Sequence, residues 1–333
     1  MPFGRAVLAL LLTLFAVASL GAAERAEHGV YQYVLDPAQG TVDGIAAAIE
    51  AAAPGAGWRV LANLPCGTPE GCKYRARVLA LHDPAYAPKL LAVNARTGPF
   101  GMVDRVSVFE DEKGVHVAVL NPRSVIRTVM MDDGLHTALA AEHLQALRAL
   151  VSGAARGTAS QRDFGQTRDK GYIGKTMGVM AGGPFVEKIE DIASVPNGDW
   201  RQVVDKVRAG LEKKGPKWGL QLAYTLEIPE REVAVLGSTG TPMDAKSFEI
   251  VGAGLDEARG SLQCPGLAHA AAYPIEIVVA KESGVIRVRL VDTMFRMKMF
   301  FEDAGKWAFM KNMGMPGSIA DEIKAQVKGS LGD

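Results

Sequence analysis

The feature that most constrains the fold of this 333-residue chain is an internal repeat. Two pairs of apolar runs alternate with period two, as β-hairpins do. Segments 105–109 and 114–117 of the first pair match 275–279 and 284–287 of the second, 170 residues later. Each hairpin follows the order helix, two strands, helix, and each precedes another helix. An order this long is hard to obtain by chance, so the sequence predicts a duplication.

Caps and periodicity define the elements of both halves. Helices are expected where a capping residue precedes an apolar stripe, and strands where apolar residues alternate. In the first half we expect strands at 30–35, 58–64, 74–81, 103–109 and 115–120, and helices at 41–53, 85–93 and 136–151. In the second half we expect strands at 220–227, 232–236, 275–280 and 285–291, and helices starting at Asp199, near 245 and at Ser318.

The N-terminus is typical of a secretory signal. Arg5 precedes the apolar run 6–20, and Gly21-Ala22-Ala23 offers small residues for cleavage. We therefore expect a signal peptide at 1–23, a periplasmic or secreted protein, and no stable membrane insertion after cleavage. The remaining chain divides into a first α+β repeat domain at 24–152, a polar linker at 153–171, and a second α+β repeat domain at 172–333 with a Met-rich insertion.

The charge of the chain is balanced, with 37 Lys+Arg against 37 Asp+Glu. Cleavage after Ala23 would remove Arg5 and leave 36 against 37, a net charge of −1. Such a chain has no bulk attraction for nucleic acid or for anionic lipid. At 48% hydrophobic residues it is also too apolar to be disordered. We expect no nucleic-acid partner.

Most of both halves resembles the domain-of-unknown-function 302 family, and the first half matches it better. The resemblance rests on the helix-then-strand pattern of 41–58, the strand Arg77-Val78-Leu79, the helix at Lys89-Leu90-Leu91, and the hairpin entry at 103–108. Val103 stands where the family commonly has Pro, and in the second half Tyr273-Pro274-Ile275 lacks the family's Arg. The resemblance implies two tandem small α+β domains, each an antiparallel sheet with helices packed on it. It supplies no catalytic residues.

Three cysteines occur in a chain predicted to be exported, where disulfides persist. Cys66 and Cys72 bracket a Gly/Pro turn between two predicted strands, which favours a disulfide between them. Cys264 is then left over, and it is expected to be buried, to link two chains, or to react. His269 lies five residues later, which leaves open a Cys–His nucleophile without a visible third group.

Methionine is concentrated in one segment. Six of the 13 methionines lie within 294–315: Met294, Met297, Met299, Met310, Met313 and Met315. Thioethers select Cu(I), so Met310, Met313 and Met315 are candidate copper ligands. Methionine also fills core gaps and binds apolar partners, and the alternation of Met297 and Met299 with Lys298 is compatible with a half-buried strand.

The histidines suggest no metal site. His136 and His143 share a helix face with Glu142 nearby, and Asp132 and Asp133 precede them. However, two helical turns separate the two rings by about 10.5 Å, too far to share one ion easily. We expect these histidines to be solvated or to cap the helix.

The function that these observations favour is non-catalytic binding of an unknown small molecule or protein partner, with a homodimer possible. No H-E-x-x-H, G-x-S-x-G or C-x-x-C-H motif is present. The candidate binding residues are the six clustered methionines, Cys264 and His269. The alternatives are a periplasmic copper(I)-binding protein and a thiol-dependent enzyme using Cys264.

Overall fold

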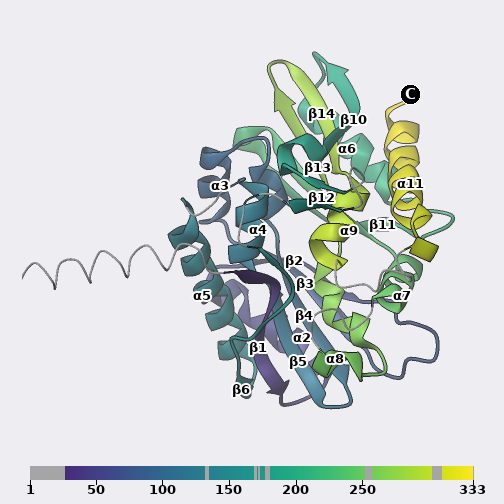
Figure 1. Ribbon diagram of the computed structural model, residues 1–333. Coiled ribbons are helices and arrows are strands. Elements are labelled where there is room, and N and C mark those ends of the chain that lie inside the picture. Colours follow the sequence, from purple (N-terminus) through teal and green to yellow (C-terminus); the bar gives the residue numbers. More distant parts are fainter. Residues whose placement is uncertain are drawn as a thin grey trace, which may run out of the picture.

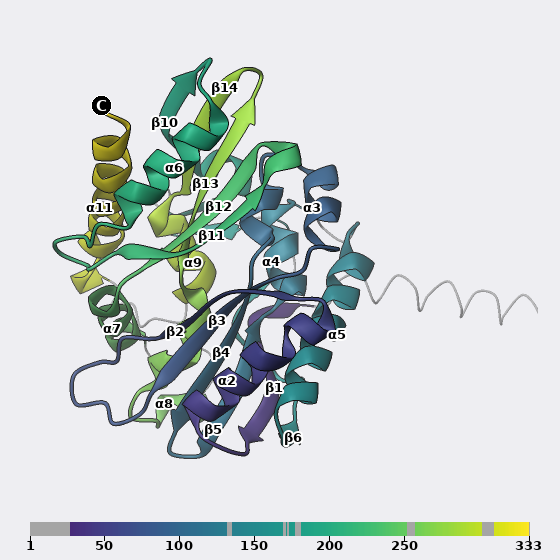
Figure 2. The ribbon, with the colours of Figure 1, turned by 180° about the vertical axis from the view of Figure 1, so that it is seen from behind.

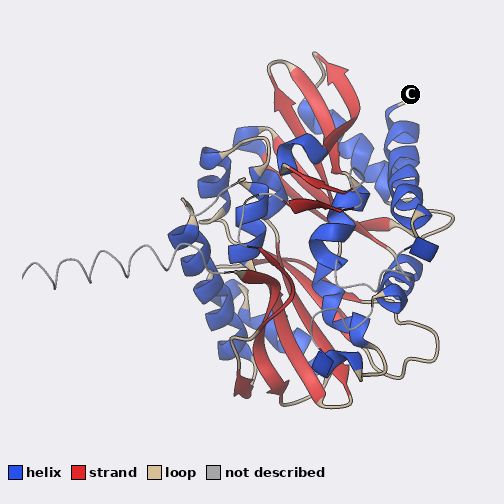
Figure 3. Cartoon of the chain, viewed as in Figure 1, coloured by secondary structure: helices blue, strands red, loops and turns tan. Residues whose placement is uncertain are grey.

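The computed structural model describes residues 27–131, 135–168, 171, 173–176, 181–251, 257–301 and 310–332. Two antiparallel sheets carry helices on their faces, so the fold is α+β as predicted (Figures 1 and 3). The predicted signal peptide at 1–23 lies outside the described residues. Within them, no helix has the length and apolar composition that a bilayer crossing needs.

The first sheet has the order β2-β3-β4-β5-β1-β6, and β7 also pairs with β1. Its strands are β1 (His28–Ala38), β2 (Arg59–Pro65), β3 (Ala76–His82), β4 (Asp104–Asp111), β5 (Gly114–Leu120), β6 (Gly157–Ala159) and β7 (Asp163–Arg168). Two helices, α2 (Val42–Ala52) and α5 (Thr137–Ala154), cover its outer face (Figure 2). The Thr41 hydroxyl accepts from the Gly44 amide and caps α2, whose apolar stripe faces the sheet.

The second sheet has the order β10-β14-β13-β12-β11. Its strands are β10 (Ile189–Pro196), β11 (Gln221–Ile228), β12 (Val233–Thr239), β13 (Ile275–Glu282) and β14 (Val285–Val291). Two helices, α6 (Trp200–Leu211) and α11 (Gly314–Leu331), pack together beside it. The Asp199 carboxylate accepts from the Gln202 amide, the predicted cap of α6.

Shorter elements connect these layers. In the first half they are η2 (Pro54–Ala56), α3 (Ala87–Val93), η3 (Gly98–Gly101) and α4 (Pro122–Val129). In the second half they are η4 (Phe185–Lys188), η5 (Pro229–Arg231), α7 (Thr241–Ile250), α8 (Glu257–Gly260), η6 (Pro265–Ala272) and α9 (Thr293–Phe301). A two-stranded sheet of β8 (Ile173–Thr176) and β9 (Ala181–Gly183) lies between the halves in sequence.

The segment 153–171, predicted as a linker without periodicity, completes the first sheet instead. It contains β6 and β7, and both pair antiparallel with β1. The Asp163 carboxylate accepts from the Gly29 amide and from the Gln32 side chain, which fixes β7 against β1. Polar strands of this kind carry little apolar signal, because one edge of the sheet is left to solvent.

The strand pairing corrects the offset of the repeat from 170 to 171 residues. Val106 pairs with Val119 in the first hairpin, and Ile277 pairs with Leu290 in the second. The match at 170 aligned Gly114 with Gly284. Gly114, however, lies directly after the two-residue turn of its hairpin, where it pairs with Asp111, whereas Gly284 is the second residue of its turn. A slip of one residue reverses which face each side chain occupies. With the correct offset, Pro274 takes the place of Val103.

The two halves share one core. In the first half η3 packs against β12 and β13 of the second sheet, and in the second half η6 packs against β3, β4 and β5 of the first sheet. Each half therefore contributes a 3-10 helix that packs on the sheet of the other half. A single cluster of buried apolar side chains runs through both, while a second cluster lies under α2 and α5.

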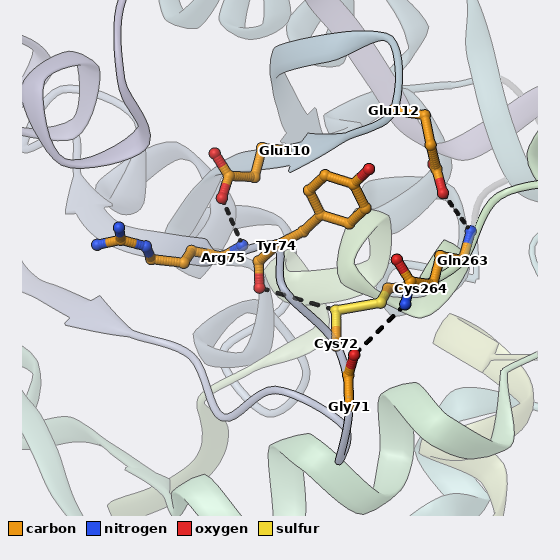
Figure 4. Close-up of a disulfide and its surroundings, with 8 residues drawn as sticks. All are labelled: Gly71, Cys72, Tyr74, Arg75, Glu110, Glu112, Gln263 and Cys264. Carbon is orange, nitrogen blue, oxygen red and sulfur yellow. Dashed lines mark hydrogen bonds between the residues drawn. A yellow bond between two sulfur atoms is a disulfide. The ribbon is translucent and has the colours of Figure 1, made fainter.

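A disulfide joins the halves, and it corrects the predicted Cys66–Cys72 pairing. Cys72, in the loop between β2 and β3, is bonded to Cys264 at the start of η6, 192 residues later (Figure 4). Cys66 is a free thiol, and burial raises its pKa. Gln263 binds Glu112 and the Gly71 carbonyl beside the disulfide. The turn packs against the second half, where Cys264 bonds to Cys72. The local sequence of the turn does not reveal this distant partner.

The same loop is anchored by a buried carboxylate. Asp244 in the first turn of α7 accepts from the Gly67 amide at 3.2 Å and from the Thr239 hydroxyl at 2.8 Å. Gly67 lies so close to the Thr241 backbone that a Cβ atom would overlap it. Burial raises the pKa of Asp244 from 3.8 to about 7.

We expect Asp244→Asn to remove a pH dependence of stability. A carboxyl whose folded pKa is raised contributes stability below its unfolded pKa, and that contribution is lost as the pH rises toward about 7. Relative to the variant, the wild type should lose roughly 2–4 kcal/mol of unfolding free energy between about pH 4 and pH 7.5. Urea unfolding at several pH values measures this difference. Parallel pH profiles would contradict it.

Candidate functional site

The second half contains a cavity of about 60 Å³. It lies between α7, α9 and α11 and reaches the start of β13. Its walls are largely apolar: Ile250, Val251, Ile275, Met297, Phe301, Met315, Pro316 and Ile319. At roughly 10–15 Å³ for each water-sized group, it has room for about four such groups. This is a space for a small molecule rather than for a large cofactor.

Two hydroxyl groups form a short relay in the cavity wall. The Ser247 hydroxyl donates to the Met243 carbonyl at 2.8 Å and lies 2.6 Å from the Tyr273 hydroxyl. Because the single proton of Ser247 is used on Met243, Tyr273 donates to Ser247. Burial raises the pKa of Tyr273, which keeps the phenol protonated. The relay is therefore neutral and directional.

The charged group of the cavity wall is Arg296 on α9, whose side chain is 4% exposed. Its guanidinium binds the Glu276 carboxylate, with 3.3 Å between Nη2 and Oε2. Arg105 on β4 of the first half binds the same carboxylate at 2.8 Å. Both guanidiniums also donate to the carbonyls of Ala272 and Pro274.

The Arg–Glu–Arg cluster lies where the repeats meet. Arg105 and Glu276 occupy equivalent positions, since they are 171 residues apart on the equivalent strands β4 and β13 of the two sheets. The Phe300 ring lies 5.1 Å from the guanidinium carbon of Arg105 and 4.8 Å from that of Arg296. Among the described residues, these contacts place two guanidiniums against one carboxylate in a nearly dry interior, and burial lowers the pKa of Arg296.

The repeat shows how the second half differs at the cavity: in the described part of the first half, the equivalent void beside Ile126 has only about 10 Å³. With the 171-residue offset, the cavity residues Tyr273, Arg296, Met297 and Phe301 correspond to Met102, Val125, Ile126 and Met130. In the first half these four side chains are 9% exposed or less and belong to the packed core. The charge at position 296 is thus an addition to an otherwise apolar position of the repeat.

The six clustered methionines occupy different environments. Met297 and Met315 line the cavity, and Met299 lines a smaller void beside Arg105. Met294 and Met313 are half-buried, while Met310 is 48% exposed. Met297 and Met299 lie on the helix α9, not on a strand, because the chain turns into a helix directly after β14. A copper site at Met310, Met313 and Met315 stays a prediction.

Cys264 and His269 do not form a nucleophilic pair. The sulfur of Cys264 is committed to the disulfide, so the thiol-enzyme alternative lacks its nucleophile. His269 is fully buried in η6 and packs among the rings of Tyr31, Phe164 and Phe301. Both residues help to seat η6 on the first sheet.

His143 is buried, and the expectation of a solvated side chain is wrong for it. Its Nε2 lies 2.9 Å from both oxygens of Asp104, and Tyr86 stacks on the ring with 3.5 Å between centroids. Asp132 and Asp133 lie outside the described residues. Among the residues that are described, no group of three or more His, Cys, Asp or Glu side chains is arranged to hold a metal ion.

The residues that distinguish the site were missed at the sequence level. Arg105 lies in the hairpin entry at 103–108 that carries the family resemblance, but that resemblance gives it no role. Glu276 and Arg296 belong to no known motif, and Ser247 and Tyr273 look like ordinary helix and loop residues. A signal did exist: the correct register of the repeat places Arg105 on Glu276 and Val125 on Arg296. Only a comparison of the two repeats shows that Arg296 stands where the first half has the core residue Val125.

Comparisons with known proteins give a limited result. No family model matches the chain, and no curated protein matches it significantly. Among solved structures, the chain is similar to an uncharacterized conserved protein DUF302 from Bacillus stearothermophilus, with 17% identity and a TM-score of 0.31. The match covers 37% of this chain and 97% of that chain. Its description names the family that the first half resembles.

Proposed function

We propose that this protein binds a small, largely apolar molecule in the cavity between α7, α9 and α11, without chemical conversion. The observation that supports it most is the cavity itself, which has a volume of about 60 Å³. In the first half, the residues equivalent to its wall belong to the packed core. Apolar walls with a few placed polar groups are the usual character of small-molecule sites.

The proposed location is outside the cytoplasm, in the periplasm or the surrounding medium. The signal-like segment 1–23 and the Cys72–Cys264 disulfide support it, because disulfides persist in oxidising compartments. The disulfide holds η6 close to the cavity, since η6 leads directly into Tyr273. Exposure to an oxidising environment would thus help to keep the site formed.

A cavity-filling substitution tests the proposal. Ile319 on α11 lines the cavity, and Ile319→Phe should occupy part of its volume. We expect butan-1-ol or butanoate at about 10 mM to raise the melting temperature of the wild type by about 2–5 °C. Ile319→Phe should show less than a quarter of that rise.

The matched control places the same residue elsewhere on α11. Leu331 is partly buried at the end of the helix and does not line the cavity, so Leu331→Phe should respond to the probes as the wild type does. If Ile319→Phe and the wild type gained the same stabilisation, the molecules would be binding elsewhere and the proposal would fail. No rise with either probe would also count against it.

A further inference from the structure

We infer that the ligand of this cavity is a monocarboxylate with a short aliphatic tail, held by its charge to Arg296. This inference rests on the proposed function and narrows it to one chemical class. It is carried by an imbalance of buried charge at the cavity wall, by a nitrogen of Arg296 that has no acceptor among the described residues, and by the size and apolar character of the space beside it.

The charge imbalance comes from two guanidiniums that share one carboxylate. Arg105 is 1% exposed, Arg296 4% and Glu276 6%, so all three are shielded from water. Arginine stays protonated in proteins, and Glu276 makes charge-paired contacts with both guanidiniums. Among the residues that the structure describes, the cluster therefore carries one positive charge more than Glu276 balances. Such a charge in a low-dielectric interior attracts an anion far more strongly than it would in water.

The hydrogen bonds of the cluster do not use all of the guanidinium donors. Nε and Nη2 of Arg296 donate to Glu276, and Nη2 also donates to two backbone carbonyls. Among the residues that the structure describes, Nη1 of Arg296 makes no hydrogen bond, and neither does the buried Nε of Arg105. A guanidinium presents its donors in a planar fork that suits a carboxylate.

The apolar walls of the cavity favour an aliphatic tail on the bound carboxylate. Apart from Arg296, the described residues of its lining include no charged side chain, and the relay from Tyr273 to Ser247 is already satisfied. A doubly charged anion such as phosphate would therefore meet apolar walls on most sides, at a large desolvation cost. Room for about four water-sized groups takes the three heavy atoms of a carboxylate and the first carbon of its tail, and the rest of a short tail would extend toward the opening of the cavity.

The charge of this arginine has no counterpart at the equivalent position of the repeat, which points to a role beyond the fold. The equivalent position of the first half holds Val125, which is 6% exposed and part of the core. A buried arginine normally carries a desolvation cost that an apolar residue avoids. Placing one beside a cavity, in only one copy of a duplicated element, is explained if a ligand supplies the missing negative charge.

Isothermal titration calorimetry with three probes of equal chain length tests the inference. Butanoate, butan-1-ol and butylamine are titrated into the full chain at constant ionic strength, with chloride at the same concentration as an inorganic anion. We expect butanoate to bind at least about tenfold more tightly than butan-1-ol, because a charge-assisted hydrogen bond is added. Butylamine and chloride should bind more weakly than the alcohol.

Variants of Arg296 separate the charge from the cavity. Arg296→Met leaves Arg105 and Glu276 as a neutral pair and should weaken butanoate binding by about 10- to 100-fold. The loss should be much larger for butanoate than for butan-1-ol, so that the preference for butanoate falls. Arg296→Lys keeps the charge and should recover part of the loss. Circular dichroism and thermal melting establish that each variant is folded.

The possible outcomes distinguish the carboxylate inference from the proposed binding of small molecules in general. If butan-1-ol bound as tightly as butanoate, or if Arg296→Met kept full butanoate affinity, the cavity would still bind small molecules but the carboxylate class would be wrong. If no probe bound to the wild type, both proposals would be wrong. If chloride bound as tightly as butanoate, the tail would contribute nothing and the site would be one for inorganic anions.

Discussion

Replacing Cys264 by serine is expected to lower the free energy of unfolding by about 2–5 kcal/mol. The disulfide to Cys72 closes a loop of 192 residues, and the cost of closing a loop in the unfolded chain grows with its length. The same bond holds the β2–β3 loop of the first half against η6 of the second. Urea unfolding of the oxidised wild type and of the variant measures the change.

The control for this prediction is Cys66. Cys66→Ser leaves the disulfide intact, so it should cost only what the loss of a partly buried thiol costs, about 1 kcal/mol or less. A non-reducing peptide map should show Cys72 joined to Cys264 in the wild type and in this variant. A peptide joining Cys66 to Cys72, or equal costs at the two positions, would overturn the assignment.

Glu276→Gln should destabilise the protein by about 3–5 kcal/mol. The substitution removes the carboxylate that two buried guanidiniums share, and leaves Arg105 and Arg296 facing each other without a counter-charge. Arg296→Met should cost less, because Arg105 and Glu276 then remain as a neutral pair. Chemical unfolding of both single variants ranks the two costs.

A double variant tests whether the loss of stability comes from the buried charges. When Glu276→Gln is combined with Arg296→Met, one guanidinium is left in place of two. The combined loss of stability should therefore be smaller than the sum of the two single losses, by about 1 kcal/mol or more. Additive losses would mean that the three side chains act through packing alone, and a Glu276→Gln variant as stable as the wild type would show that the cluster is not buried.

The elements of the fold were accessible from the sequence where the local signal was strong. Thr41 and Asp199 sit before apolar stripes of helical period, and both cap helices in the structure. The hairpins at 103–120 and 275–291 are rich in apolar residues, because most of their residues on both faces are buried. Short or polar elements such as β6 and β7 carry no such pattern, and their place in the sheet comes from pairing with β1.

The site was less accessible, because its residues are brought together by long-range packing. Cys72 meets Cys264 only once η6 lies on the first sheet, so the nearer Cys66 was the natural but wrong partner. The register of the repeat decided whether Arg105 corresponds to Ile275 or to Glu276. Matching the two turn glycines chose the wrong register, and with it hid the charged cluster. Methionine enrichment did lead to the cavity through Met297 and Met315, though not to its polar groups.

The most direct test of the account uses the methionines as reporters of the cavity. With 13C-labelled methionine methyl groups, butanoate should shift the NMR signals of Met297 and Met315, which line the cavity, and leave that of the exposed Met310 unchanged. In Arg296→Met the same addition should produce much smaller shifts. Shifts confined to Met310, or no shift at Met297 and Met315 at butanoate concentrations of about 10 mM, would contradict binding in this cavity.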